Sequence, residues 1–306
     1  MKTTYLTWQE ALQDAVHPSI DQFNAVQAAR RLHSEVAAEN QGRPVPVASV
    51  SEHICRRPDE TDIPVRIYRD HPGLVAPVVI FAHGGGWVLG SRDTHDNLCR
   101  SLCSESGWTV VSVDYCLAPE HIYPAQIDDV DLVRTWLIAN AGELEVDGDR
   151  IALAGDSAGG NLAAGVCLRH RGDPRNVFQL LFYPALDGRL LPDGWVDVQP
   201  EDVLQYDMTR WFYHTYAGDP SRLSDAEVSP ALADDLHDMP PALVIVGARD
   251  GLLRDAQLYV ARLAESGVDA QLMVVDGMEH GFVQVAALNE RRKVIRTAAA
   301  ALRSRM

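Results

Sequence analysis

The segment from Ile151 to Gly165, IALAGDSAGGNLAAG, places a single serine on a sharp turn between an apolar strand and a helix of small residues. The stretch RIALA before the turn is short and β-capable, whereas GGNLAAGVCLRH after it is compatible with a helix. A G-x-S-x-G turn of this kind strains the backbone at the serine, so small residues are required on both sides, here Gly155 and Gly159. Ser157 at its tip is a candidate nucleophile. The motif alone also occurs in ordinary glycine-rich turns, so its meaning depends on the rest of the chain.

Apolar strands and helices alternate along most of the chain. Near-continuous valine and isoleucine runs on both sides of HGGGW indicate strands that are covered on both faces. Strands are expected twice between about 47 and 69, the second at 62–69, and then at 76–82, 108–115, 151–154, 178–184, 242–248 and 270–276. Helices are expected at about 124–139, directly after Ser157, at about 253–265 and up to about 303. This order predicts an α/β fold, a mostly parallel central sheet of about eight strands with helices on both faces.

Two segments fall outside this alternation. Residues up to about 40 carry a helical stripe that includes Ile20, Phe23 and Val26. Between Asp187 and about Glu227 the chain is polar and then carries the aromatic run RWFYHTY, which is too long for a plain loop and is read as an inserted helical element. Together these segments are expected to form a cap.

Charge and cysteine content exclude several classes of function. The 27 lysine and arginine residues against 43 aspartate and glutamate residues give a net charge of -16, which disfavours nucleic acid and anionic membrane surfaces as partners. The five cysteines are scattered without a C-x-x-C motif, so neither a disulfide framework nor a zinc site is predicted, and Cys99 and Cys103 are expected to be buried. With no export signal pattern and no window of about 18 apolar residues, we expect a soluble cytoplasmic protein.

The motif HGGGW follows a predicted strand and supplies candidate oxyanion donors. Consecutive glycines let backbone N–H groups approach a tetrahedral intermediate closely, so Gly85 and Gly86 are the expected donors. The N–H of Ala158, at the start of the helix after the serine, would complement them. A phosphate-binding loop is the competing interpretation, but neither a Gly-Lys-Ser/Thr run nor G-x-G-x-x-G is present. His83, before the glycines, is interpreted as a structural histidine that shapes the loop.

A serine nucleophile needs a base and a carboxylate that orients the base. Among eleven histidines, His280 lies in the loop between the last predicted strand and the last helix, and Asp250 directly follows the preceding strand. The order Ser157, Asp250, His280 is that of α/β-hydrolases. Asp255 competes for the acidic role but falls inside the next helix. Asp114 also ends a strand but precedes the serine, which indicates a structural role.

Four motifs in this order, HGGGW, GDSAGG, DYCLAPEHIYPAQIDD and HGF, resemble the hormone-sensitive-lipase-like esterases, the bacterial family IV type with a GDSAG elbow. The resemblance covers nearly the whole chain. It implies an α/β-hydrolase fold and a carboxylesterase that acts on small ester molecules with short to medium acyl chains through an acyl-enzyme on Ser157, with no metal or organic cofactor. Members of the family often form homodimers, so a homodimer is a further expectation.

The resemblance also implies how the substrate pocket is built. The chain would be one domain, residues 1–306, with a cap contributed by about 1–45 and about 188–226. Four aromatic side chains are candidates for the pocket walls: Trp87, Trp211, Phe212 and Tyr213. For the last three, packing inside the cap is the alternative.

Two departures from the family pattern stand out. Cys116 occupies the usual arginine position of Asp-Tyr-Arg-Leu-Ala-Pro-Glu, which is expected to remove a partner of Glu120. Gly251 replaces the proline of Asp-Pro-Leu, so the loop that carries Asp250 loses a restraint on φ.

Two alternatives to an esterase remain from the sequence. Fold and triad alone do not separate ester hydrolysis from amide (arylformamide-type) or lactone hydrolysis. A ligand-binding protein on the same fold would lack the histidine, and the presence of His280 favours an enzyme.

Overall fold

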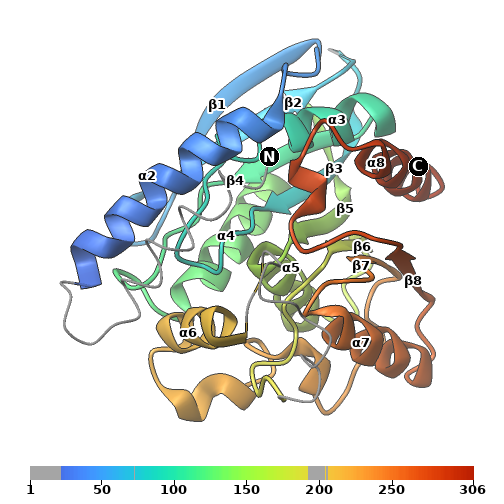
Figure 1. Cartoon of the computed structure of the whole chain (residues 1–306). Helices are drawn as coiled ribbons and strands as arrows, with labels where there is room; N and C mark the ends of the chain where they lie inside the picture. The colour runs from blue at the N-terminus through green and yellow to red at the C-terminus, as the bar shows by residue number, and fades with distance from the viewer. Residues whose placement is uncertain (1–21, 72, 192–203, 205) are drawn as a thin grey trace.

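The apolar runs of the sequence form the strands of one sheet in the computed structural model, which describes residues 22–71, 73–191, 204 and 206–306 (Figure 1). The eight strands are β1 (Ser49–Arg56), β2 (Asp62–Arg69), β3 (Ala76–Ala82), β4 (Thr109–Val113), β5 (Val146–Asp156), β6 (Asn176–Phe182), β7 (Ala242–Gly247) and β8 (Ala270–Val275). The α-helices are α2 (Gln22–Gln41), α3 (Asp96–Ser106), α4 (Ala125–Ala139), α5 (Ala158–Arg169), α6 (Tyr206–Ala217), α7 (Leu253–Glu265) and α8 (Asn289–Arg303). Short 3₁₀ turns are η2 (Pro220–Ser224), η3 (Pro230–Leu232) and η4 (Phe282–Gln284).

The strand order is β1-β2-β4-β3-β5-β6-β7-β8, and the prediction of a mostly parallel sheet of about eight strands is confirmed. β3 to β8 pair in parallel, whereas β1 and β2 are antiparallel additions at one edge. In β2 the side chains of Ile63, Val65 and Ile67 are buried and mostly alternate with less buried positions, as expected near an edge. Every residue of β4 is buried, because helices cover both faces there.

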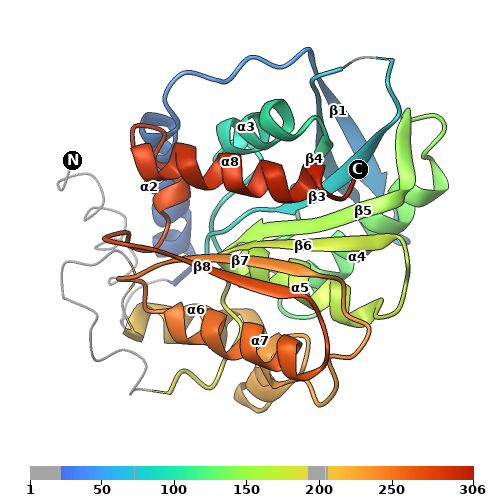
Figure 2. The same ribbon diagram turned by 90° about the vertical axis from the view of Figure 1, so that its right-hand side faces the viewer.

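The helices form two layers around the sheet. Figure 2 shows α3 and α8 on one face and α5 and α7 on the other, with the sheet between them. α4 packs against α5 in the second layer. This arrangement is the α/β architecture that the alternation of strands and helices predicts.

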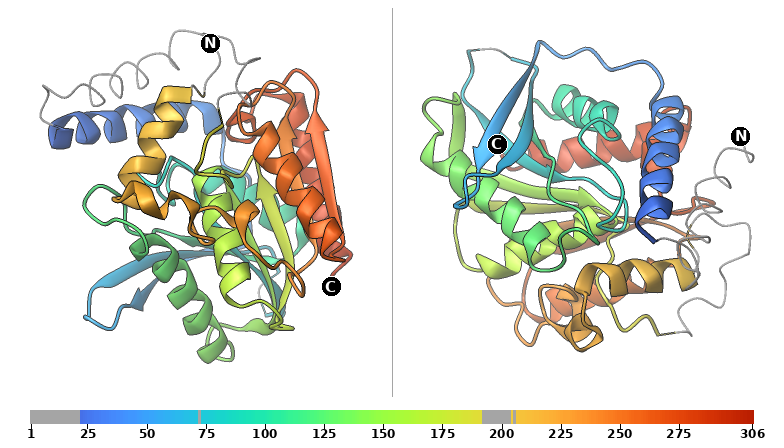
Figure 3. Two further views of the ribbon diagram at one scale, coloured as in Figure 1. Left: turned by 90° about the horizontal axis from the view of Figure 1, so that it is seen from below. Right: turned by 90° about the vertical axis from the view of Figure 1, so that its left-hand side faces the viewer.

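Two helices, α2 and α6, lie beyond the carboxyl ends of the parallel strands (Figures 2 and 3). α2 is the described part of the predicted N-terminal helical segment, and its buried face includes Val26, Ala29 and Val36. α6 carries the aromatic run RWFYHTY of the predicted insertion. Residues 1–21 and 192–203 of the predicted cap lie outside the described residues.

Arg30 attaches α2 to the body of the molecule. Its guanidinium forms a bidentate ion pair with Glu120, in which both N···O distances are 2.7 Å. The same group donates to the carbonyl oxygens of Val88 at 2.8 Å and Ala118 at 2.9 Å. Glu120 therefore has an arginine partner from α2, although position 116 holds a cysteine.

Arg30→Met is expected to lower the free energy of unfolding by about 1 kcal/mol, because it removes charge-assisted hydrogen bonds from a partly exposed site. Arg31→Met is the matched control, since Arg31 is exposed on the same helix and has no ion pair among the described residues. Urea denaturation of both variants and the wild type measures the difference. Equal effects of the two substitutions would contradict an anchoring role for Arg30.

Candidate active site

Ser157 lies at the turn between β5 and α5, with φ 53° and ψ -119°. This positive φ is the strained geometry that the G-x-S-x-G motif predicts. A Cβ atom on Gly155 would overlap the backbone of Gly159, and one on Gly159 would overlap the backbone of Ala82. Neither glycine can be replaced without moving backbone, so the two glycines make the turn at Ser157 possible.

The structure brings Ser157, His280 and Asp250 together. The Nε2 atom of His280 lies 2.9 Å from Oγ of Ser157, and its Nδ1 atom lies 2.9 Å and 3.1 Å from the two carboxylate oxygens of Asp250. The side chain of Asp250 is fully buried and that of His280 is 10% exposed. A carboxylate at Nδ1 accepts a hydrogen bond from Nδ1–H and so favours the tautomer whose Nε2 lone pair is directed at the serine hydroxyl. This is the arrangement in which imidazole acts as a general base.

Parallel strands explain why residues far apart in sequence meet here. Ser157 follows β5, Asp250 follows β7 and His280 follows β8, and the carboxyl ends of these strands lie at one edge of the sheet. The loop after β7 is held without the usual proline: the N–H of Leu252 donates to Oδ1 of Asp250 at 2.9 Å, and the N–H of Leu253 donates to its carbonyl at 3.0 Å. The substitution at Gly251 therefore leaves Asp250 fixed by hydrogen bonds.

The loop of residues 83–90, here called the oxyanion loop, presents free backbone donors beside Ser157. Gly85 has φ 123° and Gly86 has φ 61°, conformations that favour glycine. Among the described residues, the N–H groups of Gly85 and Gly86 donate to no other group. Ala158 is the first residue of α5, so its N–H has no acceptor within the helix. The three predicted donors are thus available to a negatively charged oxygen.

The alternatives weighed for the acid and the base take structural positions. Asp255 lies in the first turn of α7, where Oδ2 accepts from the N–H groups of Leu186 at 2.9 Å and Asp187 at 3.0 Å. Burial raises the pKa of Asp255 to about 7. Asp114 accepts from the N–H of Arg92 at 3.1 Å. Neither carboxylate is bonded to His280.

His83 shapes the oxyanion loop from inside. Its Nδ1 atom lies 2.9 Å from the carbonyl oxygen of Gly84, and its ring stacks on Tyr115 at a centroid distance of 4.2 Å. Burial lowers the pKa of His83 to about 3, so the ring is neutral at ordinary pH. No bond joins it to Ser157.

A cavity of about 120 Å³ opens above Ser157 and His280. Most of its wall comes from α2, the oxyanion loop, α6 and the segments after the strands. Of the four aromatic candidates, Trp87, Phe212 and Tyr213 line the cavity, whereas Trp211 is not among its lining residues and makes an edge contact with Phe212 at 5.3 Å. A Cβ atom on Gly86 would overlap the ring of Phe212. The Phe212 ring therefore lies directly against the oxyanion loop.

Two residues that the sequence analysis left unassigned complete the site. Asp156, the middle residue of the GDS motif, accepts a hydrogen bond of 2.8 Å from the N–H of Gly84. His95 lies 3.0 Å from the same carboxylate, and both side chains are 4% exposed. The position of Asp156 next to the serine is visible in the sequence, but nothing local distinguishes His95 from the other histidines.

Other kinds of site are not found in the described part of the chain. It contains no group of three or more His, Cys, Asp or Glu side chains placed to hold a metal ion. All five cysteines are free, and Cys99 and Cys103 are buried as expected. Within the same residues, no helix combines the length and apolar character needed to cross a membrane.

The chain is similar to known proteins over most of its length. A family model described as alpha/beta hydrolase fold matches residues 79–284. Carboxylesterase NlhH of Mycobacterium tuberculosis is 41% identical over 235 residues, which cover 74% of this chain and 73% of that protein. Ethyl acetate hydrolase of Pseudomonas putida is 32% identical over 270 residues, covering 86% and 84% of the two chains. The solved structure of a hyperthermophilic esterase from Pyrobaculum calidifontis superposes with a TM-score of 0.86 at 36% identity, covering 98% of this chain and 97% of that one.

Asp250→Asn and Asp255→Asn separate the two candidate acids. Asp250→Asn is expected to lower kcat on a nitrophenyl ester by roughly 10³- to 10⁴-fold, because an amide facing Nδ1 favours the wrong tautomer of His280. Asp255→Asn is expected to stay within about threefold of the wild type, since the amide oxygen can still accept from the backbone. Steady-state kinetics per folded active site measures both. The reverse ranking would assign the acidic role to Asp255.

Proposed function

The chain belongs to the alpha/beta hydrolase family whose model matches residues 79–284, and on that basis we propose that it is a serine carboxylesterase of short- to medium-chain esters with Ser157 as its nucleophile. The observation that carries the proposal is the unbroken chain of contacts from Asp250 through His280 to Ser157, with 2.9 Å on each side of the imidazole. The names of its relatives, carboxylesterase and ethyl acetate hydrolase, agree with ester substrates.

The first half-reaction forms an acyl-enzyme. Oγ of Ser157 attacks the ester carbonyl carbon while Nε2 of His280 takes the hydroxyl proton. The carbonyl oxygen becomes an oxyanion and accepts hydrogen bonds from the N–H groups of Gly85, Gly86 and Ala158. When the intermediate collapses, the C–O bond to the alcohol breaks and His280 gives its proton to the departing alkoxide. The buried carboxylate beside Nδ1 stabilises the imidazolium in between.

The second half-reaction returns the free enzyme. Water enters the position that the alcohol has left, and His280 takes one of its protons as it attacks the acyl carbon. The same backbone donors hold the second oxyanion. Collapse breaks the bond to Oγ of Ser157, which recovers its proton from the imidazolium, and the carboxylic acid departs. After the cycle, Ser157 and His280 have the protonation states with which they began.

The size of the cavity supports short to medium acyl chains. An apolar cavity of about 150 Å³ accommodates a benzene molecule. The cavity above Ser157, at about 120 Å³, is of similar size. Its apolar side is formed in part by Phe212, Tyr213 and Leu252. A bulky chain would have to displace these side chains.

The cellular location, the cap and the oligomeric state are also part of the proposal. We place it in the cytoplasm, because all five cysteines are free and four of them are buried. The cap from about 1–45 and about 188–226, within a single domain, is supported by the position of α2 and α6 beside the cavity. The homodimer stays a prediction, for which light scattering coupled to size-exclusion chromatography is the test.

Ser157→Ala and His280→Ala are each expected to remove nearly all turnover, roughly 10⁵- to 10⁶-fold in kcat, and the double variant should lose little more, since the residues act as a unit. The measurement is release of nitrophenol from acetyl, butyryl, octanoyl and palmitoyl esters, with circular dichroism as the control for folding. Ester turnover that persists in Ser157→Ala would refute the assignment. Turnover of an arylformamide or a lactone but of no ester would redirect it to those substrates.

Phe212→Ala is expected to raise the ratio of octanoyl to acetyl turnover by roughly tenfold, because it removes a ring from the cavity wall and gives a longer chain room. Trp211→Ala is the matched control, as Trp211 is the neighbouring aromatic residue on α6 and does not line the cavity. We expect its ratio to stay within about twofold of the wild type. Identical shifts in the two variants would show that Phe212 does not limit chain length.

A further inference from the structure

A buried pair outside the three proposed catalytic residues, His95 and Asp156, lies beneath the oxyanion loop. Nε2 of His95 is 3.0 Å from Oδ1 of Asp156 and 3.2 Å from Oδ2, and each side chain is only 4% exposed. His95 precedes the first turn of α3, whereas Asp156 is the last residue of β5. The pair thus joins two segments that are 61 positions apart in sequence. The proposed reaction uses neither side chain directly.

The carboxylate of Asp156 touches both halves of the site. Oδ1 accepts from the N–H of Gly84 at 2.8 Å, and Gly84 directly precedes the two glycines whose N–H groups are free. Oδ2 accepts from Nε2 of Gln284 at 3.1 Å and lies 3.4 Å from the hydroxyl of Tyr183. Asp156 itself directly precedes Ser157. One carboxylate therefore sets the position of the oxyanion loop relative to the nucleophile.

Polar contacts at both ring nitrogens fix the orientation of His95. The hydroxyl of Thr94 has one proton, which it donates to the carbonyl oxygen of Ser91 at 2.8 Å. The Thr94 oxygen must then accept from Nδ1 of His95, which is 2.8 Å away. Nε2 lies 3.0 Å from Oδ1 of Asp156 and 3.3 Å from the backbone N atom of Gly84. The ring of His95 therefore joins Thr94 to the contact between Asp156 and Gly84.

Burial determines the charge of the neighbouring histidines. It is the main cause that lowers the pKa of His33 to about 4 and the pKa of His83 to about 3, so both rings are neutral. Burial alone would raise the pKa of Asp156, but His95 and the hydrogen bonds from Gln284 and Gly84 outweigh burial and hold that pKa below its usual range. The ionised form of Asp156 is therefore favoured although the side chain is buried.

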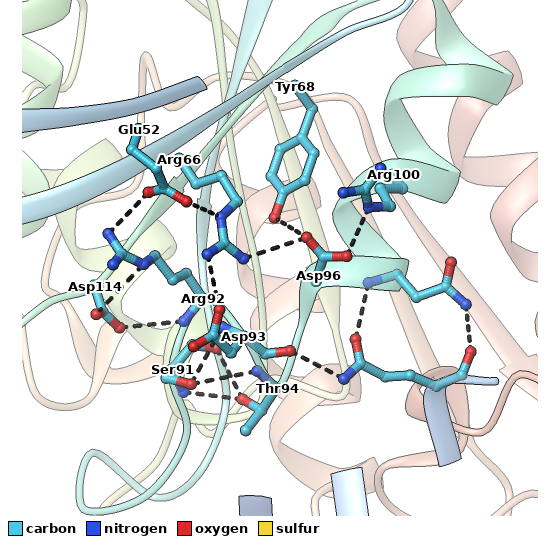
Figure 4. A network of polar contacts seen from close by, with 12 residues as sticks. Glu52, Arg66, Tyr68, Ser91, Arg92, Asp93, Thr94, Asp96, Arg100 and Asp114 are labelled. Carbon is cyan, nitrogen blue, oxygen red and sulfur yellow. Dashed lines mark hydrogen bonds and ion pairs between the residues drawn. The ribbon is translucent and has the colours of Figure 1, made fainter. Parts of the chain in front are cut away.

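The segment that carries His95 is held from its outer side by charged groups of β1, β2 and the segment after β4 (Figure 4). Arg66 pairs with Asp93 at 2.8 Å and with Asp96 at 3.3 Å. Arg92 pairs with Glu52 at 3.1 Å. Arg92 and Asp93 belong to the turn formed by residues 91–94, Asp96 follows it, and Thr94, the partner of Nδ1, is the last residue of that turn. His95 is thus fixed from the strand side and transmits its position to Asp156.

We propose that His95 is a positioning residue for the oxyanion hole: through Asp156 it holds Gly84, and with it the N–H groups of Gly85 and Gly86, at the place where the oxyanion forms. This inference rests on the proposed function, since an oxyanion hole matters only if Ser157 attacks a carbonyl. Donors placed beforehand stabilise the transition state more than the bound ester. Loss of the His95 side chain removes the contacts that hold Asp156 and Gly84 and frees the loop, so we expect it to lower kcat while KM changes little.

His95→Leu is expected to lower kcat on nitrophenyl butyrate roughly 10- to 100-fold, with KM within about threefold of the wild type. His95→Gln keeps a donor toward Asp156 and should recover part of the loss. Butylboronic acid, whose boron forms a tetrahedral anion on the serine oxygen, should bind His95→Leu more weakly by about the factor lost in kcat/KM. His237→Leu is the control, because His237 is 71% exposed and lies before β7, away from the carboxyl ends of the strands.

Hydrogen–deuterium exchange tests the positioning without turnover. Exchange of peptides that cover residues 83–90 should become faster in His95→Leu and stay at the wild-type rate in His237→Leu. If the wild type hydrolyses no ester, the proposed function fails. The exchange rate of residues 83–90 then decides alone whether His95 positions the oxyanion loop. Where His95→Leu does not fold, Thr94→Val removes the acceptor at Nδ1 and serves for both measurements.

Two results would overturn the proposal. One is unchanged exchange of the oxyanion loop in a folded variant that lacks the His95 side chain. The other is a loss of activity that follows only the fraction of folded enzyme, with kcat per folded site and boronic acid affinity unaltered, because that pattern indicates a purely structural role.

Discussion

The strained turn at Ser157 depends on backbone packing so close that no side chain fits within it. Gly155 and Gly159 lie against each other and against the end of β3, and a Cβ atom on either would overlap backbone. The same contact brings the start of the oxyanion loop next to the serine, since that loop follows β3 directly. One steric requirement thus exposes the hydroxyl and places backbone N–H groups beside it, so the turn and the loop can only be formed together.

Three buried aspartates near this turn have different roles because their surroundings differ. Asp156 faces His95 and stays ionised, with its pKa below the usual range. Asp250 faces Nδ1 of His280, where it orients the proposed base. In the described part of the chain, the hydrogen bonds to Asp255 come from backbone N–H groups, and burial raises its pKa to about 7. The group that faces each carboxylate, the ring of His95, the ring of His280 or a backbone amide, accounts for these different roles.

Part of the cavity wall and the nucleophile turn belong to different parts of the molecule. The strands and the turn fix Ser157, whereas the cavity wall is completed by α2 and α6, which lie beyond the sheet. α2 is attached through Arg30 to Glu120 and to two carbonyls of the body. On α6 the ring of Phe212 reaches down to Gly86. Changes on these helices can therefore alter the shape of the cavity while leaving Ser157 and His280 in place.

The sequence by itself determined the elements and the chemistry of the turn, because these follow from local periodicity and steric rules. β2 at 62–69 and α7 at 253–265 have the predicted bounds, and the parallel order of strands places Ser157, Asp250 and His280 at one edge. Only the tertiary structure decided partners distant in sequence. Neighbouring Trp211 and Phe212 differ in whether they face the cavity, and Arg30 finds Glu120 at a separation of 90 residues. His95 likewise finds Asp156, because the packing of whole elements, which no local pattern encodes, selects which charges meet.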